Sequence, residues 1–154
     1  MYAIEVNSLT KKFGDFKAVD NISFHVEEGE IFGFLGPNGA GKSTTMMILT
    51  TLLKPTSGYA LVGGHNVVSE AKKVRKKIGY VQQEISVDEF LTGRENLYLH
   101  ARINQVPNNQ ISSRIDEVIE LVELTEKQDK AALTYSGGMR KRLDIANGLL
   151  SRPS

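Results

Sequence analysis

The sequence predicts an α/β fold, because strand patterns, a glycine-rich loop and helical patterns follow one another along its 154 residues. Three observations carry this prediction. Polar and apolar residues alternate over residues 22–26, as they do in a half-buried strand. The apolar run at residues 30–35 leads into a glycine-rich loop that opens onto a helical pattern. Further along, apolar residues recur at helical spacing, which predicts a mainly helical segment over residues 85–135.

Short strands and a helix are predicted in the N-terminal half, each bounded by turn residues. The expected strands cover residues 22–26, 30–35, 59–62 and 78–83, and the second of them is expected to be buried. A helix is expected over residues 42–53, and Pro55 stops it. Its apolar stripe contains Ile48, Leu49, Leu52 and Leu53.

N-cap residues mark the helices expected in the C-terminal half. Thr92 and Glu95 fit a capping box, which predicts a helix from there to about Ile103. A second helix is expected from about Asn108, and Ser136 is expected to cap a last one. The apolar face of the second helix contains Ile111, Ile115, Val118, Ile119 and Val122. The apolar face of the last helix contains Met139, Leu143, Ala146 and Leu150.

The composition excludes several kinds of protein. Apolar residues make up 40% and charged residues 24% of the chain, as in ordinary globular domains. There is no cysteine, which excludes a disulfide framework and a thiolate zinc site. The net charge of +1 is too small to indicate a nucleic-acid partner. The longest apolar runs fall short of the roughly 20 residues that a membrane-spanning helix needs, so we expect any membrane association to come from a partner.

Residues 36–44, here called the phosphate loop, match the Walker A pattern Gly36-x-x-x-x-Gly41-Lys42-Ser43. The glycines let successive backbone N–H groups point at phosphate oxygens, and the following helix adds its positive end. Lys42 is expected to bridge the β- and γ-phosphates, and the Ser43 hydroxyl to bind Mg²⁺. The sequence therefore predicts a nucleotide site, for ATP with Mg²⁺. The residues expected to contact ATP are Asn38, Gly39, Ala40, Gly41, Lys42, Ser43 and Thr44.

Two further segments resemble motifs of the ATP-binding cassette (ABC) ATPases. Ser136-Gly137-Gly138, here called the signature segment, is similar to the family's signature motif at the start of a helix. Residues 78–83 resemble the strand and glutamine loop that lie between the two phosphate motifs, with Gln83 as the glutamine. The resemblance implies a P-loop NTPase core with an N-terminal antiparallel β region and a helical subdomain, incomplete at the C-terminus.

The resemblance also implies roles for single residues. Phe13 corresponds to an aromatic residue that stacks on adenine, and Val19 to a residue that flanks the nucleotide. Gln83 corresponds to a glutamine that approaches Mg²⁺ and the attacking water, and the signature segment to one that binds the ATP of a partner subunit. Taken singly, each has a plainer interpretation. Phe13 is then a core residue of a hairpin, Gln83 a surface residue, and the signature segment an ordinary capped helix start.

The resemblance divides the chain into three segments. Residues 1–84 form the nucleotide-binding β and P-loop core, residues 85–135 the helical subdomain, and residues 136–154 the signature helix. The finer resemblance is to drug exporters typified by the daunorubicin-resistance ATPases. Its marks are residues 52–58, residues 86–89 with 91–93, and Tyr135 in place of the usual leucine.

As a whole, the resemblance implies the ATP-binding subunit of an exporter-type ABC transporter. Such subunits act with a separate membrane permease as head-to-tail homodimers or heterodimers of ATPase domains, in the cytoplasm at the inner face of the membrane. The family's Walker B aspartate and catalytic glutamate correspond to positions beyond Ser154, so we expect this piece to bind ATP without hydrolysing it. A second hypothesis is a naturally short regulatory module that binds ATP and does not hydrolyse it.

Overall fold

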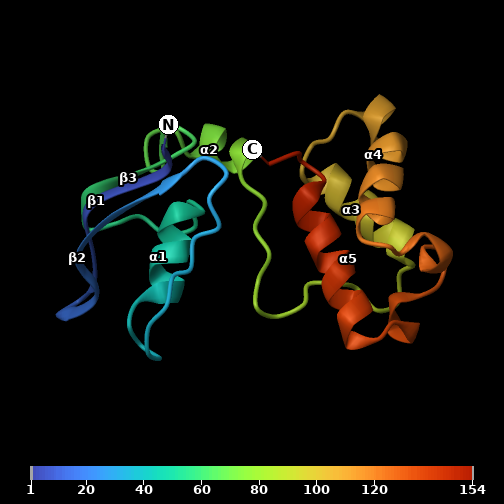
Figure 1. Ribbon diagram of the computed structural model, residues 1–154, viewed down its shortest axis with the longest axis horizontal. Helices are drawn as coiled ribbons and strands as arrows, with labels where there is room; N and C mark the ends of the chain where they lie inside the picture. Colours follow the sequence, from blue (N-terminus) through green and yellow to red (C-terminus); the bar gives the residue numbers. More distant parts are fainter. Residues whose placement is uncertain (1, 154) are drawn as a thin grey trace. The chain divides into compact units, whose positions relative to one another are not determined.

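The structure is a computed structural model and describes residues 2–153. Across these residues the chain forms two compact units, one that ends at Lys77 and one over Ile78–Pro153 (Figure 1). The first unit combines a β-sheet with helices and contains the phosphate loop, whereas the second is helical and contains Gln83 and the signature segment. The predicted segments 1–84, 85–135 and 136–154 concern function and stay a prediction.

Residues 2–77 are built on a four-stranded antiparallel sheet with the strand order β2-β1-β3-β4. The strands are β1 (Tyr2–Phe13), β2 (Phe16–Glu27), β3 (Ser57–Val62) and β4 (His65–Asn66). The alternation predicted over residues 22–26 is confirmed in β2, because Ile22, Phe24 and Val26 are buried or half-buried whereas Ser23 and His25 are exposed. The strand predicted at residues 59–62 is confirmed as part of β3.

The first helix, α1 (Lys42–Leu49), begins within the phosphate loop and contacts β2 and β3. It buries the first two residues of its predicted apolar stripe. The prediction that it continues to residue 53 is wrong. The Thr50 hydroxyl donates to a carbonyl one turn back at 2.8 Å, and Thr51 takes a left-handed φ of 66°, so the backbone leaves the helix there. Leu52 is exposed as a consequence.

Two predicted strands do not form within residues 2–153. Residues 30–35 and 78–83 have no regular secondary structure, so both predictions are wrong. The expected burial of the first is wrong too, because Leu35 is 93% exposed and Ile31 fully exposed. A strand needs a neighbour that pairs with its backbone N–H and C=O groups. None of the strand pairs of the described residues includes either segment, so their apolar composition does not suffice to make them strands.

The second unit packs helices side by side around one apolar core (Figure 1). They are α3 (Gly93–Ile103), α4 (Asn108–Leu121) and α5 (Gly137–Leu149). The short 3₁₀ turns η1 (Thr125–Lys127) and η2 (Ala132–Thr134) lie between α4 and α5. The capping box is confirmed, because the Thr92 hydroxyl accepts from the Glu95 N–H at 3.1 Å and the Glu95 carboxylate accepts from the Thr92 N–H at 2.8 Å.

The predicted apolar faces of α4 and α5 are confirmed as well. Every residue predicted for the α4 face is buried, and of those predicted for α5 only Met139 is half-buried. The predicted cap of α5 forms, since the Ser136 hydroxyl accepts from the Met139 N–H at 3.2 Å. No helix within residues 2–153 combines the length and apolar character that crossing a bilayer requires.

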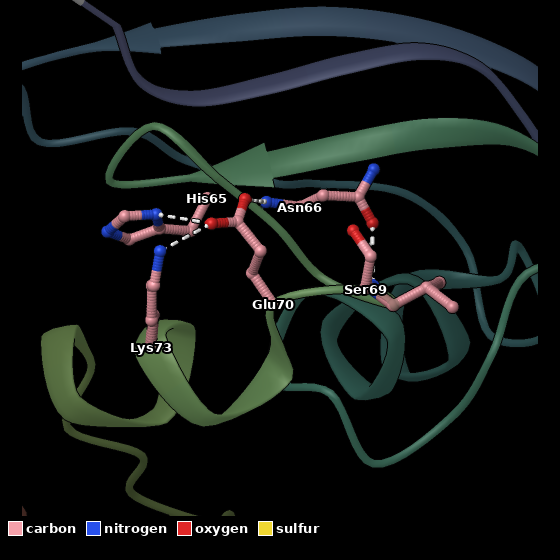
Figure 2. A network of polar contacts seen from close by, with 6 residues as sticks. His65, Asn66, Ser69, Glu70 and Lys73 are labelled. Carbon is pink, nitrogen blue, oxygen red and sulfur yellow. Dashed lines mark hydrogen bonds and ion pairs between the residues drawn. The ribbon is translucent and has the colours of Figure 1, made fainter.

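In the first unit a polar network joins β4 to α2 (Ala71–Lys77), as Figure 2 shows. The Glu70 carboxylate accepts from the Lys73 ammonium at 2.9 Å and from the Asn66 backbone N–H at 3.1 Å. The imidazole of His65 lies 3.3 Å from the same carboxylate. The hydrogen bond from Lys73, followed by that from Asn66, lowers the pKa of Glu70 from its ordinary 4.5 to about 2. The connection between β4 and α2 is therefore held by an ionised carboxylate.

Candidate nucleotide-binding site

Two glycines in the left-handed conformation shape the phosphate loop, Gly39 with φ 83° and Gly41 with φ 87°. A Cβ on Gly41 would lie 2.2 Å from the carbonyl oxygen of Ala18 on β2, so glycine alone fits there. The same Cβ would lie 3.2 Å from a methyl carbon of Val19, which is buried. Val19, predicted to flank the nucleotide, thus packs behind the loop and supports it.

Lys42 reaches back across the phosphate loop from the first position of α1. Its ammonium donates to the carbonyl oxygens of Gly36 at 2.6 Å and of Pro37 at 2.7 Å. The positive charge and the N-terminal end of α1 therefore meet at one turn of backbone, an arrangement that attracts an anion. Ser43 lies in the same first turn with its side chain exposed. Asn38, with the loop residues around it, is exposed as well.

Phe13 lies at the tip of the hairpin formed by β1 and β2, where it pairs with Phe16. Its side chain is 52% exposed, so the plainer interpretation of Phe13 as a core residue does not hold. The Lys11 ammonium lies 5.1 Å from the centre of the Phe13 ring. The ammonium lies over the ring, and a ring that is half exposed still offers an aromatic surface on which a flat base can stack.

The signature segment begins α5 in the second unit, and all three of its residues are exposed. The Ser136 hydroxyl caps the helix, as the plainer interpretation requires. The glycines have no such local reason. Neither has a positive φ, a Cβ on Gly137 would meet no atom within 4 Å, and one on Gly138 would meet only the Ser136 hydroxyl oxygen at 4.0 Å. Glycine is a poorer helix former than alanine, so the presence of two glycines at the start of α5 is not explained by the packing of this unit.

Gln83 lies exposed in the irregular stretch before α3. Side chains of α5 hold this stretch. The Lys141 ammonium donates to the Gln82 carbonyl oxygen at 2.6 Å, and the Asp144 carboxylate accepts from the Ser86 hydroxyl at 2.8 Å. The sequence marked Ser86 only as part of the drug-exporter segment 86–89, and it gave Lys141 and Asp144 no role at the site. One signal could have found Asp144, namely an acidic residue between the apolar positions 143 and 146 of a helical stripe.

Comparison with known proteins identifies the family. The family model described as ABC transporter matches residues 19–154. This chain belongs to the ABC transporter family. The chain is 44% identical over 151 residues to the daunorubicin resistance ATP-binding protein DrrA3 of Streptomyces coeruleorubidus. It is 42% identical over 153 residues to the doxorubicin resistance ATP-binding protein DrrA of Mycobacterium tuberculosis. These matches cover 98% of this chain but only 48% and 46% of the relatives, so the chain spans about half their length.

Solved structures confirm the ABC ATPase fold. CbiO1 of Clostridium perfringens, part of an ABC transporter complex, matches with a TM-score of 0.87 and 28% identity, over 99% of this chain and 62% of that one. The ATP-binding cassette MJ0796, a dimer bound to ADP and Pi, matches with a TM-score of 0.79 and 29% identity, over 97% of this chain and 70% of that one. The antiparallel sheet and the helical unit of this ABC chain are therefore those of the family fold.

Two sequence marks of the drug-exporter branch make one contact in this ABC chain. The Tyr135 hydroxyl donates to the Lys127 carbonyl oxygen at 2.6 Å from a buried position. A Cβ on Gly93 would lie 2.4 Å from that hydroxyl oxygen, so the glycine makes room for the tyrosine. Burial raises the pKa of Tyr135, which keeps the hydroxyl protonated as a donor.

The residues that the structure describes also bear on the metal. Within residues 2–153 there is no group of three or more histidine or acidic side chains able to hold a metal ion. A Mg²⁺ ion that accompanies a nucleotide is a different case, because it keeps several waters and binds mainly through phosphate oxygens. Ser43, exposed in the first turn of α1 directly after Lys42 in the chain, fits that kind of site.

Proposed function

We propose that this chain binds ATP with Mg²⁺ through the phosphate loop, as the ATP-binding part of an exporter-type ABC transporter. One observation carries the proposal. Gly41 is held against β2 in a conformation and a space that exclude any side chain, and this places the Lys42 ammonium across the loop at the start of α1. A loop so tightly constrained around a cation and a helix N-terminus suits a phosphate chain.

The contacts of ATP follow from this placement. The backbone of residues 38–44 surrounds the phosphates, Lys42 binds the β- and γ-phosphates, and the half-exposed Phe13 ring stacks on adenine. Ser43 is a ligand of Mg²⁺. For Gln83 the support is the family resemblance alone, which assigns it to the same ion. The ion neutralises charge on the phosphate oxygens when it is bound. Val19 acts from behind, since it is buried against Gly41.

The signature segment binds the ATP held by a second ATPase domain, in a head-to-tail dimer. Its exposed N–H groups at the start of α5 and the open space beside Gly137 support this assignment. The smallest side chain lets another surface approach the helix backbone closely. The predicted segments then keep their functional meaning, with a nucleotide core at residues 1–84, a helical subdomain at 85–135 and the signature helix at 136–154.

This chain spans about half the length of its relatives. We therefore consider hydrolysis, transport and membrane partners for the whole protein. We assign to that protein ATP hydrolysis coupled to export by a separate permease, at the inner face of the membrane. The resistance ATP-binding proteins among the relatives support the exporter subtype. Most of the catalytic apparatus then lies outside the contacts described above, and this chain contributes nucleotide binding.

The experiment is calorimetric titration of Mg-ATP into Lys42→Ala. Loss of a charged hydrogen-bonding partner of the phosphates is expected to weaken binding by about 10- to 100-fold. Lys54→Ala is the matched control, since it removes an exposed lysine of the same unit and is expected to leave affinity unchanged. Equal affinity of Lys42→Ala and the parent protein, in a folded variant, would show that the phosphate loop is not the nucleotide site.

A further inference from the structure

The irregular stretch at residues 82–89, here called the glutamine loop, is fastened to α5 at three points. Lys141 donates to the Gln82 carbonyl oxygen at 2.6 Å, Asp144 accepts from the Ser86 hydroxyl at 2.8 Å, and an ion pair joins Arg140 to Glu89. The three α5 side chains lie within two turns of the helix that begins with the signature segment. One short helix therefore carries the signature segment at its start and holds the loop that carries Gln83.

Asp144 is the unusual member of this set. It is 3% exposed, and the buried residues of α5 around it are Leu143, Ala146 and the polar but uncharged Asn147. A buried carboxylate is costly unless it is paired and hydrogen-bonded. Lys141 supplies the charge at 3.2 Å, and Ser86 supplies a hydroxyl donor with its backbone N–H at 3.4 Å. The loop thus provides two of the three donors that Asp144 receives, so displacing the loop leaves the carboxylate undersatisfied.

The two ends of the glutamine loop are held differently. At its C-terminal end, Asp88 and Glu89 also bond to Asn96 and to the backbone N–H of Leu133. Between residues 82 and 87, the side-chain hydrogen bonds found in the described part of the chain all come from Lys141 and Asp144. The side-chain hydrogen bonds that position the half of the loop with Gln83 are therefore those to α5.

We propose that Asp144, with Lys141, is a positioning residue that makes the glutamine loop and the signature segment move as one body. A displacement of Gln83 is then passed to the start of α5 through a buried carboxylate and a lysine. The inference rests on the proposed function for the meaning of Gln83 and the signature segment. The fastening itself does not, because it is a property of the second unit without nucleotide.

Hydrogen exchange of the full-length protein, without nucleotide, tests the fastening. Asp144→Ala is expected to speed exchange of the Ser86 amide, within residues 82–87, about tenfold, since it removes the charged acceptor of that N–H. Exchange in α3 and α4 is expected to stay unchanged. Asp144→Asn keeps an acceptor for Ser86 and is expected to restore part of the protection. Ser86→Ala, an exposed substitution that leaves Asp144 and its lysine in place, is expected to raise exchange in the same residues.

Glu123→Gln is the matched control. It weakens another ion pair of α5, the 3.3 Å contact between Glu123 and Arg142. The Glu123 side chain is 85% exposed and lies far along the chain from Gln83. It is expected to leave exchange over residues 82–87 unchanged. Unaltered exchange there in both Asp144→Ala and Ser86→Ala would overturn the proposal. Faster exchange throughout the helical unit would overturn it too, because Asp144 would then serve only its stability.

Steady-state ATP hydrolysis by the full-length protein tests the consequence. Asp144→Ala is expected to lower kcat about tenfold and to leave KM for ATP unchanged, because the phosphate loop belongs to the other unit. A rise in KM with unchanged kcat would contradict the positioning role. The two proposals fail separately. Lys42→Ala tests nucleotide binding, whereas loop protection in the absence of nucleotide tests the fastening.

Discussion

The helical unit buries an apolar core within itself, whereas the segment that leads into the phosphate loop leaves most of its apolar side chains exposed. Leu97, Ile115 and Leu143, one from each long helix, are at most 2% exposed. Ile31 and Leu35 carry equally apolar side chains and are almost entirely exposed. A helix satisfies its backbone hydrogen bonds internally, while a strand depends on a neighbour for them. Apolar composition therefore leads to burial in one region and not in the other.

Side-chain contacts alone do not replace the backbone hydrogen bonds that residues 30–35 lack. Near residue 31, Phe32 stacks on Phe24 of β2 with ring centroids 5.5 Å apart, and Phe34 lies 5.4 Å from the same ring. Phe32 nonetheless stays 42% exposed. Aromatic pairs add about 0.5–1.5 kcal/mol beyond their buried area, which is too little to fix a backbone whose N–H and C=O groups remain unpaired.

The largest expected effect tests the helical side of this comparison. Leu143→Ala empties a fully buried position of the core and is expected to lower the opening free energy of α4 amides by about 2–5 kcal/mol. Native-state hydrogen exchange measures this quantity for the helical unit by itself.

The matched change in the other region is Leu35→Ala. It removes the same atoms from a 93% exposed side chain and is expected to alter stability by no more than about 0.5 kcal/mol. Equal losses from the two substitutions would mean that residue 35 is buried in the folded protein, and the comparison would break.

The same contrast explains what could be predicted from the sequence. Helix starts were predictable because local groups make them, as at Thr92 with Glu95 and at Ser136. That residues 30–35 form no strand was not predictable, because strand formation depends on residues distant in sequence. For the site, the glycines and Lys42 follow from local chemistry. The tie between Asp144 and Ser86 joins residues 58 positions apart, which no local pattern records.

A medium effect is expected where α3 begins, inside the helical unit. Gly93→Ala places a methyl group 2.4 Å from the Tyr135 hydroxyl oxygen, and the overpacking is expected to cost about 1–3 kcal/mol. In a Tyr135→Phe background the oxygen is gone, so the same substitution is expected to cost less. Urea unfolding of the four proteins of this cycle measures the coupling. Additive losses would show that the glycine is not there to admit the tyrosine.

The smallest expected effect concerns charge. It tests whether a paired carboxylate stabilises only the unit in which it lies. The pKa of Glu70 is about 2 in the folded chain against an ordinary 4.5 (Figure 2). A lowered folded pKa means that the carboxylate stabilises the fold above pH 4.5 and that this contribution is lost as the pH falls from about 4.5 to about 2. Glu70→Gln is expected to flatten the pH dependence of amide exchange in β3 and α2 across that window.

Glu117, whose pKa is also about 2 through Arg114 and then Arg152, offers the counterpart in the helical unit. Glu117→Gln is expected to flatten the pH dependence in α4 and to leave β3 unchanged. If either substitution changed the pH dependence in both units, the two would not titrate as separate bodies, and the contrast between a self-contained helical unit and its neighbour would have to be withdrawn.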